Sequence, residues 1–169
     1  MSGPLTAIDR RRVLTGAGIL ALLAVAAPAC GSAPTPPEVD ALEAQRLLAQ
    51  HDSELAAAAG TALTGPDDTA QATALAQVSL ERADHARALA TEISRASGRP
   101  APETSQTSTS TAVPDAPAPT VSQVVNALRA AADSSGKLAI ASSGYRAGLL
   151  ASIAASCTAS YAVALAVQS

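Results

Sequence analysis

The sequence has very few aromatic side chains: it contains two tyrosines, no phenylalanine and no tryptophan. Proteins that bind nucleic acid usually combine a basic face with rings that stack on bases. This chain has neither feature, because acidic side chains outnumber basic ones and the formal net charge is −3. We therefore expect no nucleic-acid partner. The same scarcity disfavours β-sheets, since strands are enriched in aromatic and β-branched residues.

Signatures of nucleophilic catalysis are missing as well. The chain contains no Gly-x-Ser-x-Gly element and no glycine-rich phosphate loop. Its two cysteines are Cys30 and Cys157. Cys157 lies in an apolar stretch with no histidine near it in sequence, so we interpret it as a small buried hydrophobic residue. We predict no catalytic residues, no enzymatic activity and no cofactor.

Alanine supplies most of the hydrophobic content, which is 48% of the chain. Alanine has the highest intrinsic helix propensity, and its small side chain lets helices approach closely. A chain of 169 residues allows one domain with appendages. The composition therefore predicts an all-α protein with one helical domain.

The first 30 residues have the order of a secretory signal. Three arginines (residues 10–12) precede an apolar run over residues 13–27, and small residues lead to Cys30. The apolar run is shorter than the roughly 20 residues that a membrane-spanning helix needs. We predict a cleaved export signal over residues 1–30; the alternative is an uncleaved N-terminal anchor helix. Arg10 and Arg11, followed by Val13 and Leu14, also resemble a twin-arginine signal, although Asp9 departs from the usual Ser or Thr of that pattern. Sec and twin-arginine export therefore both remain open.

Cys30 is the predicted lipidation site. Residues 27–30 (Ala-Pro-Ala-Cys) resemble a bacterial lipobox, in which the cysteine becomes the acylated first residue of the mature protein. Pro28 and the missing leucine at position 27 depart from that pattern, and the same residues match a plain Ala-x-Ala site that would release a secreted protein. Two or more acyl chains, palmitate among them, would anchor the chain stably. We favour a lipoprotein held on the extracytoplasmic side of the cell membrane. If Cys30 is not acylated, a disulfide with Cys157 becomes possible.

Beyond Cys30 the sequence divides into a tether, two helical pairs and a linker. Residues 31–37 are rich in Gly, Ser and Pro, and residues 99–119 are rich in Pro, Ser and Thr, which predicts a disordered linker. Apolar periodicity and helix-end signals predict the first pair over residues 38–98 and the second over 120–169. The four helices are expected at about residues 38–60, 69–97, 120 or 121 to 133 or 138, and 142–167.

Several signals refine these helices. Asp67 or Asp68 is expected to cap the second helix, Gly98 to end it, and Thr120 to form a capping box with Gln123. The segment Ser134-Ser135-Gly136 either breaks or bends the third helix.

The fourth helix has no charged residue after Arg146 and is long enough to span a bilayer, yet its Ala and Ser content favours a buried helix of the domain. The predicted apolar stripe of the second helix is Ala72, Leu75, Ala76, Leu80, Ala83, Leu89 and Ile93. Gly144 and Gly148 are expected at a close helix contact, and Tyr145 and Tyr161 in or beside the core.

This layout of four helices with one long connection resembles the ferritin-like domains of unknown function in alanine-rich actinobacterial exported proteins. The resemblance covers about residues 38–167. Proteins of the ferritin-like class that bind two metal ions use Glu from two helices and Glu-x-x-His from the other two. Here the nearest match is Glu81-Arg82-Ala83-Asp84-His85, in which the histidine comes one position late.

The ligand set that the resemblance implies is incomplete. Glu43, His51 and Glu54 could face the second helix, but the third offers only Asp133 and the fourth offers no Glu, Asp or His. A di-iron centre is therefore not expected. A smaller site for one zinc or copper ion remains conceivable at His51 and His85, together with Glu54 or Glu81. The alternative is that these residues are solvated, with Glu81, Arg82, Asp84 and Arg87 forming ordinary surface ion pairs.

The overall expectation is an envelope lipoprotein whose helical bundle acts by binding. The predicted partners are the membrane, through the lipid on Cys30, and a protein of the cell envelope. The competing expectation is a ferritin-like protein that binds a metal ion or a small ligand without a complete di-iron site.

Overall fold

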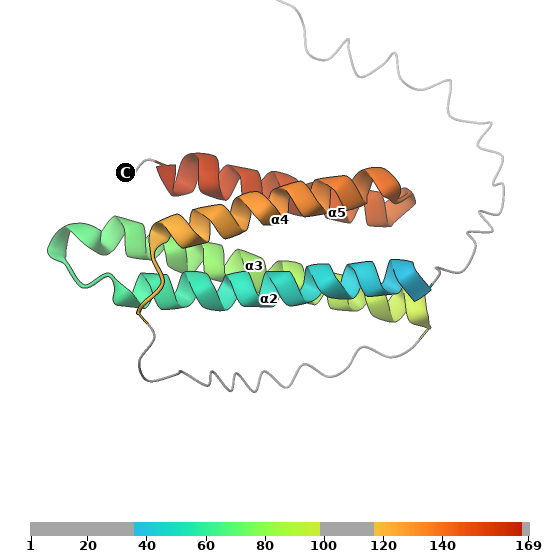
Figure 1. Cartoon of the computed structure of the whole chain (residues 1–169), viewed down its shortest axis with the longest axis horizontal. Helices are drawn as coiled ribbons and strands as arrows, with labels where there is room; N and C mark the ends of the chain where they lie inside the picture. Colours follow the sequence, from blue (N-terminus) through green and yellow to red (C-terminus); the bar gives the residue numbers. More distant parts are fainter. Residues whose placement is uncertain (1–35, 99–116, 167–169) are drawn as a thin grey trace, which may run out of the picture. The chain divides into compact units, whose positions relative to one another are not determined.

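The computed structural model describes residues 36–98 and 117–166, and within these ranges the chain is all-α with no strand. The helices are α2 (Pro36–Ala62), α3 (Thr69–Ser97), α4 (Val121–Ala141) and α5 (Gly144–Ala159), as Figure 1 shows. A short 3-10 turn, η1 (Pro66–Asp68), precedes α3, and a π-helical turn, η2 (Ser160–Ala164), extends α5. The prediction of an all-α, four-helix bundle is confirmed. The export signal, Cys30 and residues 99–116 of the predicted linker lie outside the described residues.

The four helices run in two opposite directions. α2 and α3 form an antiparallel hairpin, and α4 and α5 form another. α5 is antiparallel to α3, because Glu81 of α3 contacts Ser160 whereas Glu92, three turns later, contacts Arg146. α3 and α4 therefore point the same way (Figure 1). This order of directions is that of bundles with one long crossover connection.

The helix ends follow local sequence signals. The backbone N–H of Gln123 donates to Thr120 Oγ1 (3.3 Å) and that of Thr120 donates to Gln123 Oε1 (2.7 Å), so the predicted capping box is confirmed. Gly98 ends α3 with a left-handed φ of 65°, as expected for a glycine at this position. Asp68 occupies the N-cap position of α3, as predicted for one of the two aspartates, but its side chain makes no capping hydrogen bond to α3. The Asp68 carboxylate instead accepts a hydrogen bond from the N–H of Gly65 (2.9 Å) and closes the η1 turn.

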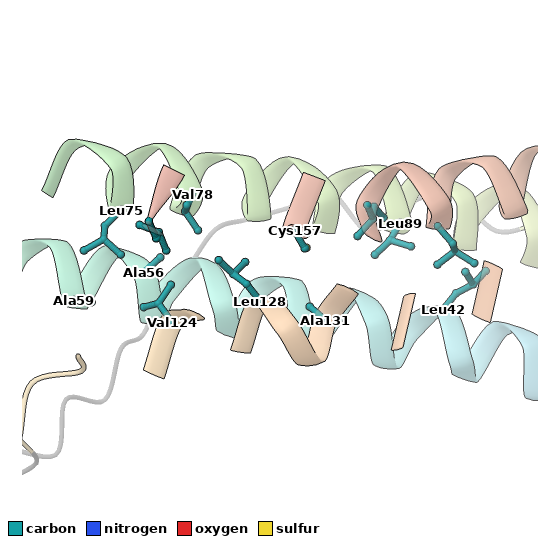
Figure 2. Packing of buried hydrophobic residues seen from close by; sticks show 13 residues of the cluster. Leu42, Ala56, Ala59, Leu75, Val78, Leu89, Val124, Leu128, Ala131 and Cys157 are labelled. Carbon is teal, nitrogen blue, oxygen red and sulfur yellow. The ribbon is translucent and has the colours of Figure 1, made fainter. Parts of the chain in front are cut away.

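The bundle interior is lined by small and branched aliphatic side chains. Figure 2 shows labelled side chains from several helices pointing into the space between the ribbons. A close approach of α2 to α3 occurs at Gly60, where an added Cβ would lie 3.3 Å from the Cβ of Leu75. The buried alanines Ala49, Ala56 and Ala59 line the same face of α2. The core of the described residues is completed by Leu42, Val78, Leu89, Val124, Leu128, Ala131, Leu150, Ile153, Cys157 and Leu165.

Some predicted positions differ from the observed ones. Leu80 is predicted on the core stripe of α3, yet it is exposed, and Tyr145 is exposed rather than in or beside the core. Tyr161 packs at the core edge as expected, with the Arg129 guanidinium 5.3 Å from its ring centroid. An added Cβ at Gly148 would meet nothing within 4 Å, so the expectation of a close helix contact is wrong there.

Helix α4 continues without a break through Ser134-Ser135-Gly136 and ends at Ala141. The segment from Gly144 to Ala164 is the one part of the described chain that is long and apolar enough to cross a membrane. Length and composition alone do not show a membrane span, because the core helix of a soluble protein can be equally long and apolar. Here α5 packs on α4 and contributes Leu150, Ile153 and Cys157 to the core, although most of the segment is not buried.

Candidate functional site

A group of polar side chains lies inside the bundle between α2, α3 and α5. Its central members are Asp52 and Arg82. The buried positions of α3 recur every three or four residues, so Arg82 occupies the core position between Val78 and Ala86. Asp52 has the corresponding position on α2, between Ala49 and Ala56. The helical period therefore turns both charges inward.

Asp52 and Arg82 form an enclosed ion pair. Arg82 Nη2 donates to Asp52 Oδ2 at 2.8 Å, and each side chain is only 2% exposed. Each partner also keeps one buried atom, Asp52 Oδ1 or Arg82 Nε, without a hydrogen-bond partner among the described residues. Enclosing two charges costs desolvation free energy that the pair's attraction offsets only when the geometry is good and the other polar atoms are satisfied. The pair is therefore held in place by the surrounding fold.

The second guanidinium nitrogen of Arg82 links α3 to α5. Arg82 Nη1 lies 3.2 Å from His85 Nδ1 and donates to Cys157 Sγ at 3.4 Å. Because an arginine can only donate, Nδ1 must be the acceptor, which assigns the proton of a neutral imidazole to Nε2. Arg82 therefore joins α2, its own helix and α5 through one side chain.

The surroundings of this pair shift three pKa values. Burial raises the pKa of Asp52 above its usual range, and this effect exceeds the opposing attraction of Arg82. Burial also raises the pKa of the Cys157 thiol, with Arg82 acting in the opposite direction. Burial, reinforced by the positive charge of Arg82, lowers the pKa of His85 to about 4. At neutral pH His85 is uncharged and Cys157 is a thiol rather than a thiolate.

Glu81 extends the polar contacts toward the end of α5. Its Oε2 accepts hydrogen bonds from Ser160 Oγ (3.2 Å) and Ser156 Oγ (3.4 Å), and its Oε1 accepts one from Gln77 Nε2 (3.1 Å). Both serines belong to the segment that lacks charged residues. They supply the hydroxyl donors that a carboxylate from α3 needs when it faces that helix.

A second charged cluster lies three turns along α3, around Glu92. The Glu92 side chain is 1% exposed and receives two hydrogen bonds from Arg95, at 2.6 and 2.7 Å. Arg146 of α5 approaches the same carboxylate, with its Nε 3.5 Å from Oε1, and its Nη1 lies 3.6 Å from Glu38 Oε2 on α2. Unlike Arg82, both arginines of this cluster reach solvent.

The four residues of the conceivable metal site are not brought together as a ligand set. His51 and Glu54 are exposed on α2, whereas Glu81 binds serines of α5 and His85 binds Arg82. Within residues 36–98 and 117–166, no group of three or more His, Cys, Asp or Glu side chains is arranged to hold a metal ion. The residues next to His85 and Glu81 in the interior are an arginine and hydroxyls, which are unsuitable or poor metal ligands.

Sequence reasoning missed the enclosed pair because it assigned Arg82 to a solvated face. The surface interpretation holds for Asp84 and Arg87, which pair with each other on the exposed side of α3. A signal was available: counting from Leu75 and Val78 by steps of three or four residues reaches Arg82, Ala86 and Leu89. The predicted stripe instead passes through Leu80, which lies two residues, or about 200°, from the observed face at 82.

The outer surface of the bundle carries a few large apolar side chains. They are Leu47 on α2, Leu80 on α3, Ile140 near the end of α4, Tyr145 at the start of α5 and Val163 in η2. Ile140 and Tyr145 flank the short turn between α4 and α5, whereas the others are separate. These residues are the exposed apolar groups with which another molecule could interact.

The arrangement favours a structural role for the interior and binding at the surface. Each buried polar side chain of the described residues has a hydrogen-bond partner, either another buried group, as in the Asp52–Arg82 pair, or a group nearer the surface, and the thiol of Cys157 is enclosed and protonated. Comparison with protein-family models, with curated proteins and with solved structures gives no match. The resemblance to ferritin-like domains therefore remains an expectation from the predicted helix layout and the alanine-rich sequence.

Proposed function

We propose that this protein is an exported lipoprotein, anchored on the outer side of the cell membrane through acylated Cys30, whose helical bundle acts by binding a protein partner. The observation that carries this proposal is the position of Cys30. It ends a leader of three arginines and a short apolar run, and five residues (31–35) separate it from Pro36, where α2 begins. A lipid on Cys30 would thus be joined to the bundle by a short tether.

The enclosure of the described groups with shifted pKa values supports binding over catalysis. Catalytic acids, bases and nucleophiles must reach a substrate. Among the described residues, the candidates with strongly altered environments are Asp52, His85 and Cys157, and all three contact Arg82 or lie beside it in the interior. Asp52 and Cys157 are enclosed and His85 is half-buried against Arg82, so these groups serve the fold.

The outer faces of α2 and α3 support a protein as the partner. Leu47 and Leu80 are each more than half exposed, and each has an exposed alanine about one turn earlier on its helix, Ala44 or Ala76. Small neighbours let a second helix approach closely while a protruding leucine enters its groove. Contacts of this kind need no enzymatic chemistry, and the resemblance to ferritin-like domains of unknown function implies none.

Mass spectrometry of the mature protein tests the anchor. We expect Cys30 as the first residue, carrying the mass of its acyl chains, in protein extracted from the membrane fraction. Cys30→Ser should abolish incorporation of labelled palmitate and release the protein from the membrane, whereas the control Cys157→Ser should do neither. A mature chain that begins at Cys30 with a free thiol, or an intact chain dissolved in the cytosol, would contradict the proposal.

Site-specific photo-crosslinking tests the partner. A photoreactive residue in place of Leu80 should give a crosslinked product of one discrete mass in intact cells. The same residue in place of Asp67, which is exposed in the η1 turn, is the matched control and should give none. A metal ion bound stoichiometrically by the purified protein, and lost in both His51→Ala and His85→Ala, would instead favour a metal-binding protein.

A further inference from the structure

The turn between α4 and α5 presents two large apolar side chains to solvent. Ile140 is 89% exposed and Tyr145 is 67% exposed, and only a few residues around Ser142 and Ser143 separate them. Exposing an isoleucine almost completely forgoes the free energy that its burial would provide. No described side chain covers either residue, so this tip of the bundle can contact another surface.

This turn lies at the end of the bundle where α2 begins. Arg146, in the first turn of α5, has its Nη1 3.6 Å from Oε2 of Glu38, in the first turn of α2. Figure 1 shows the start of α2 and the turn between α4 and α5 at the same end. Ile140 and Tyr145 are therefore close to the point at which the N-terminal segment joins the folded chain.

The length of that segment decides what this end of the bundle faces. Residues 31–35 separate Cys30 from Pro36. Fully extended, such a segment reaches at most about 20 Å. α2 itself is about 40 Å long at 1.5 Å per residue. An acylated Cys30 would therefore keep the α4–α5 turn near the bilayer.

We propose that this end of the bundle docks on the lipid surface, with Ile140 and Tyr145 inserted into the membrane interface. The proposal rests on the acylation of Cys30 proposed above. Tyrosine suits this position because its ring is apolar and its hydroxyl remains hydrated, as in the aromatic belts of membrane proteins. Isoleucine gains by transfer from water into the acyl region. The lipid anchor and the turn would fix the orientation of the bundle on the membrane.

Two side chains suffice for docking only because the chain is already anchored. A short tether gives the second contact a high effective concentration, so a weak interaction becomes populated. The charged side chains near the turn are paired, Arg95 with Glu92 and Lys137 with Asp133. The contact is therefore apolar and should be equally strong on neutral and on anionic lipids, with little response to salt.

Tryptophan fluorescence tests the docking, because the natural chain contains no tryptophan. The variant Tyr145→Trp places a single indole at the turn, and Val163→Trp is the matched control. Val163 is 63% exposed and lies 18 residues further along the same helical segment, about 27 Å away along its axis. The acylated full-length mature protein of each variant is reconstituted into phosphatidylcholine vesicles, with and without brominated acyl chains.

We expect the indole emission of the Tyr145→Trp variant to shift to the blue and to be quenched by brominated lipid, while that of the Val163→Trp control stays unchanged. Adding Ile140→Ser to Tyr145→Trp should lower the ratio of docked to undocked protein by about tenfold, which corresponds to losing the burial of one isoleucine. Vesicles that contain phosphatidylglycerol should give the same result as neutral ones. All the substituted residues are exposed, so circular dichroism should show an unchanged fold.

The possible failures are distinguishable. Acylated Tyr145→Trp protein whose emission is neither shifted nor quenched overturns the docking and leaves the anchor intact. A mass spectrum with unmodified Cys30 overturns the docking together with the proposed function. Quenching of both tryptophan variants overturns the docking as well, because it would mean that the whole α5 segment enters the bilayer. A shift for Tyr145→Trp that appears without lipid as protein concentration rises also overturns it, and assigns the turn to a second copy of the chain.

Discussion

Arginine side chains form ion pairs with buried carboxylates at two levels along the axis of this bundle, and the two sites differ in their access to solvent. At the first level Asp52 and Arg82 enclose each other, and both are removed from solvent. At the second level Glu92 is equally buried, but its partners Arg95 and Arg146 extend to the surface. The same chemical groups thus form a closed pair in one place and an open cluster in the other.

The difference shows how the cost of burying a charge depends on its partner. In the open cluster one carboxylate receives two guanidinium groups, and those groups remain hydrated. In the closed pair neither charge is hydrated and each keeps an unpaired atom, so the favourable interactions barely offset desolvation. The closed pair therefore contributes mainly to specificity, because only one alignment of α2 and α3 brings Asp52 and Arg82 together.

Breaking the closed pair from one side should have the largest effect. Arg82→Met leaves the Asp52 carboxylate buried without a cation, and we expect the free energy of unfolding to fall by about 3–5 kcal/mol. Urea unfolding followed by circular dichroism measures this change.

The double variant Arg82→Met with Asp52→Leu provides the matched comparison. It removes both charges and fills the space with apolar atoms, so its stability should return to the wild-type value or exceed it. A double variant as unstable as Arg82→Met alone would mean that the pair stabilises the bundle outright.

The sequence predicts the helices of this bundle better than it predicts their inward faces. Helix α3 spans Thr69–Ser97, the range expected from Asp68, Gly98 and the apolar period, because those signals act locally. The inward position of Arg82 depends on the rotation of α3 against α2, which alanine-rich faces specify weakly. Several faces of such a helix have similar hydrophobicity, so the predicted core face wrongly includes the exposed Leu80.

The residues of the candidate site show the same limit. The sequence predicts that Cys157 is buried, and it is, but its contact with Arg82 joins residues 75 positions apart that no local pattern connects. The histidines are candidate ligands in sequence because His51 and His85 could meet across antiparallel helices. The observed rotation leaves His51 in solvent and turns His85 toward Arg82 instead.

Weakening the open cluster should have a smaller effect than breaking the closed pair. Glu92→Gln removes the charge but keeps an acceptor oxygen for Arg95 or Arg146, and both arginines can be solvated. We expect a loss of about 1–2 kcal/mol in the free energy of unfolding, measured by the same urea titration. Glu43→Gln, at a surface pair with Arg46, is the control and should change stability by less than about 0.5 kcal/mol. A loss for Glu92→Gln as large as that for Arg82→Met would remove the distinction between the two levels.

The pH dependence of stability probes the surroundings of the closed pair through His85 and Asp52. Because the pKa of His85 is lowered from 6.5 to about 4, the unfolded chain binds a proton in that interval that the native state does not. The histidine therefore lowers stability as the pH falls from 6.5 toward 4. The raised pKa of Asp52 acts in the opposite direction, since its contribution is complete below pH 3.8 and is lost as the pH rises.

Comparing wild type with His85→Gln isolates the contribution of the histidine, because the variant keeps that of Asp52 and an acceptor for Arg82. After allowance for the partial exposure of the ring, the wild type should lose about 1–2 kcal/mol more than His85→Gln between pH 7 and pH 4. Urea unfolding at the two pH values measures the difference. If His85→Gln loses as much stability as the wild type over this interval, the ring titrates as it does in water and the surroundings of Arg82 are more hydrated than their enclosure implies.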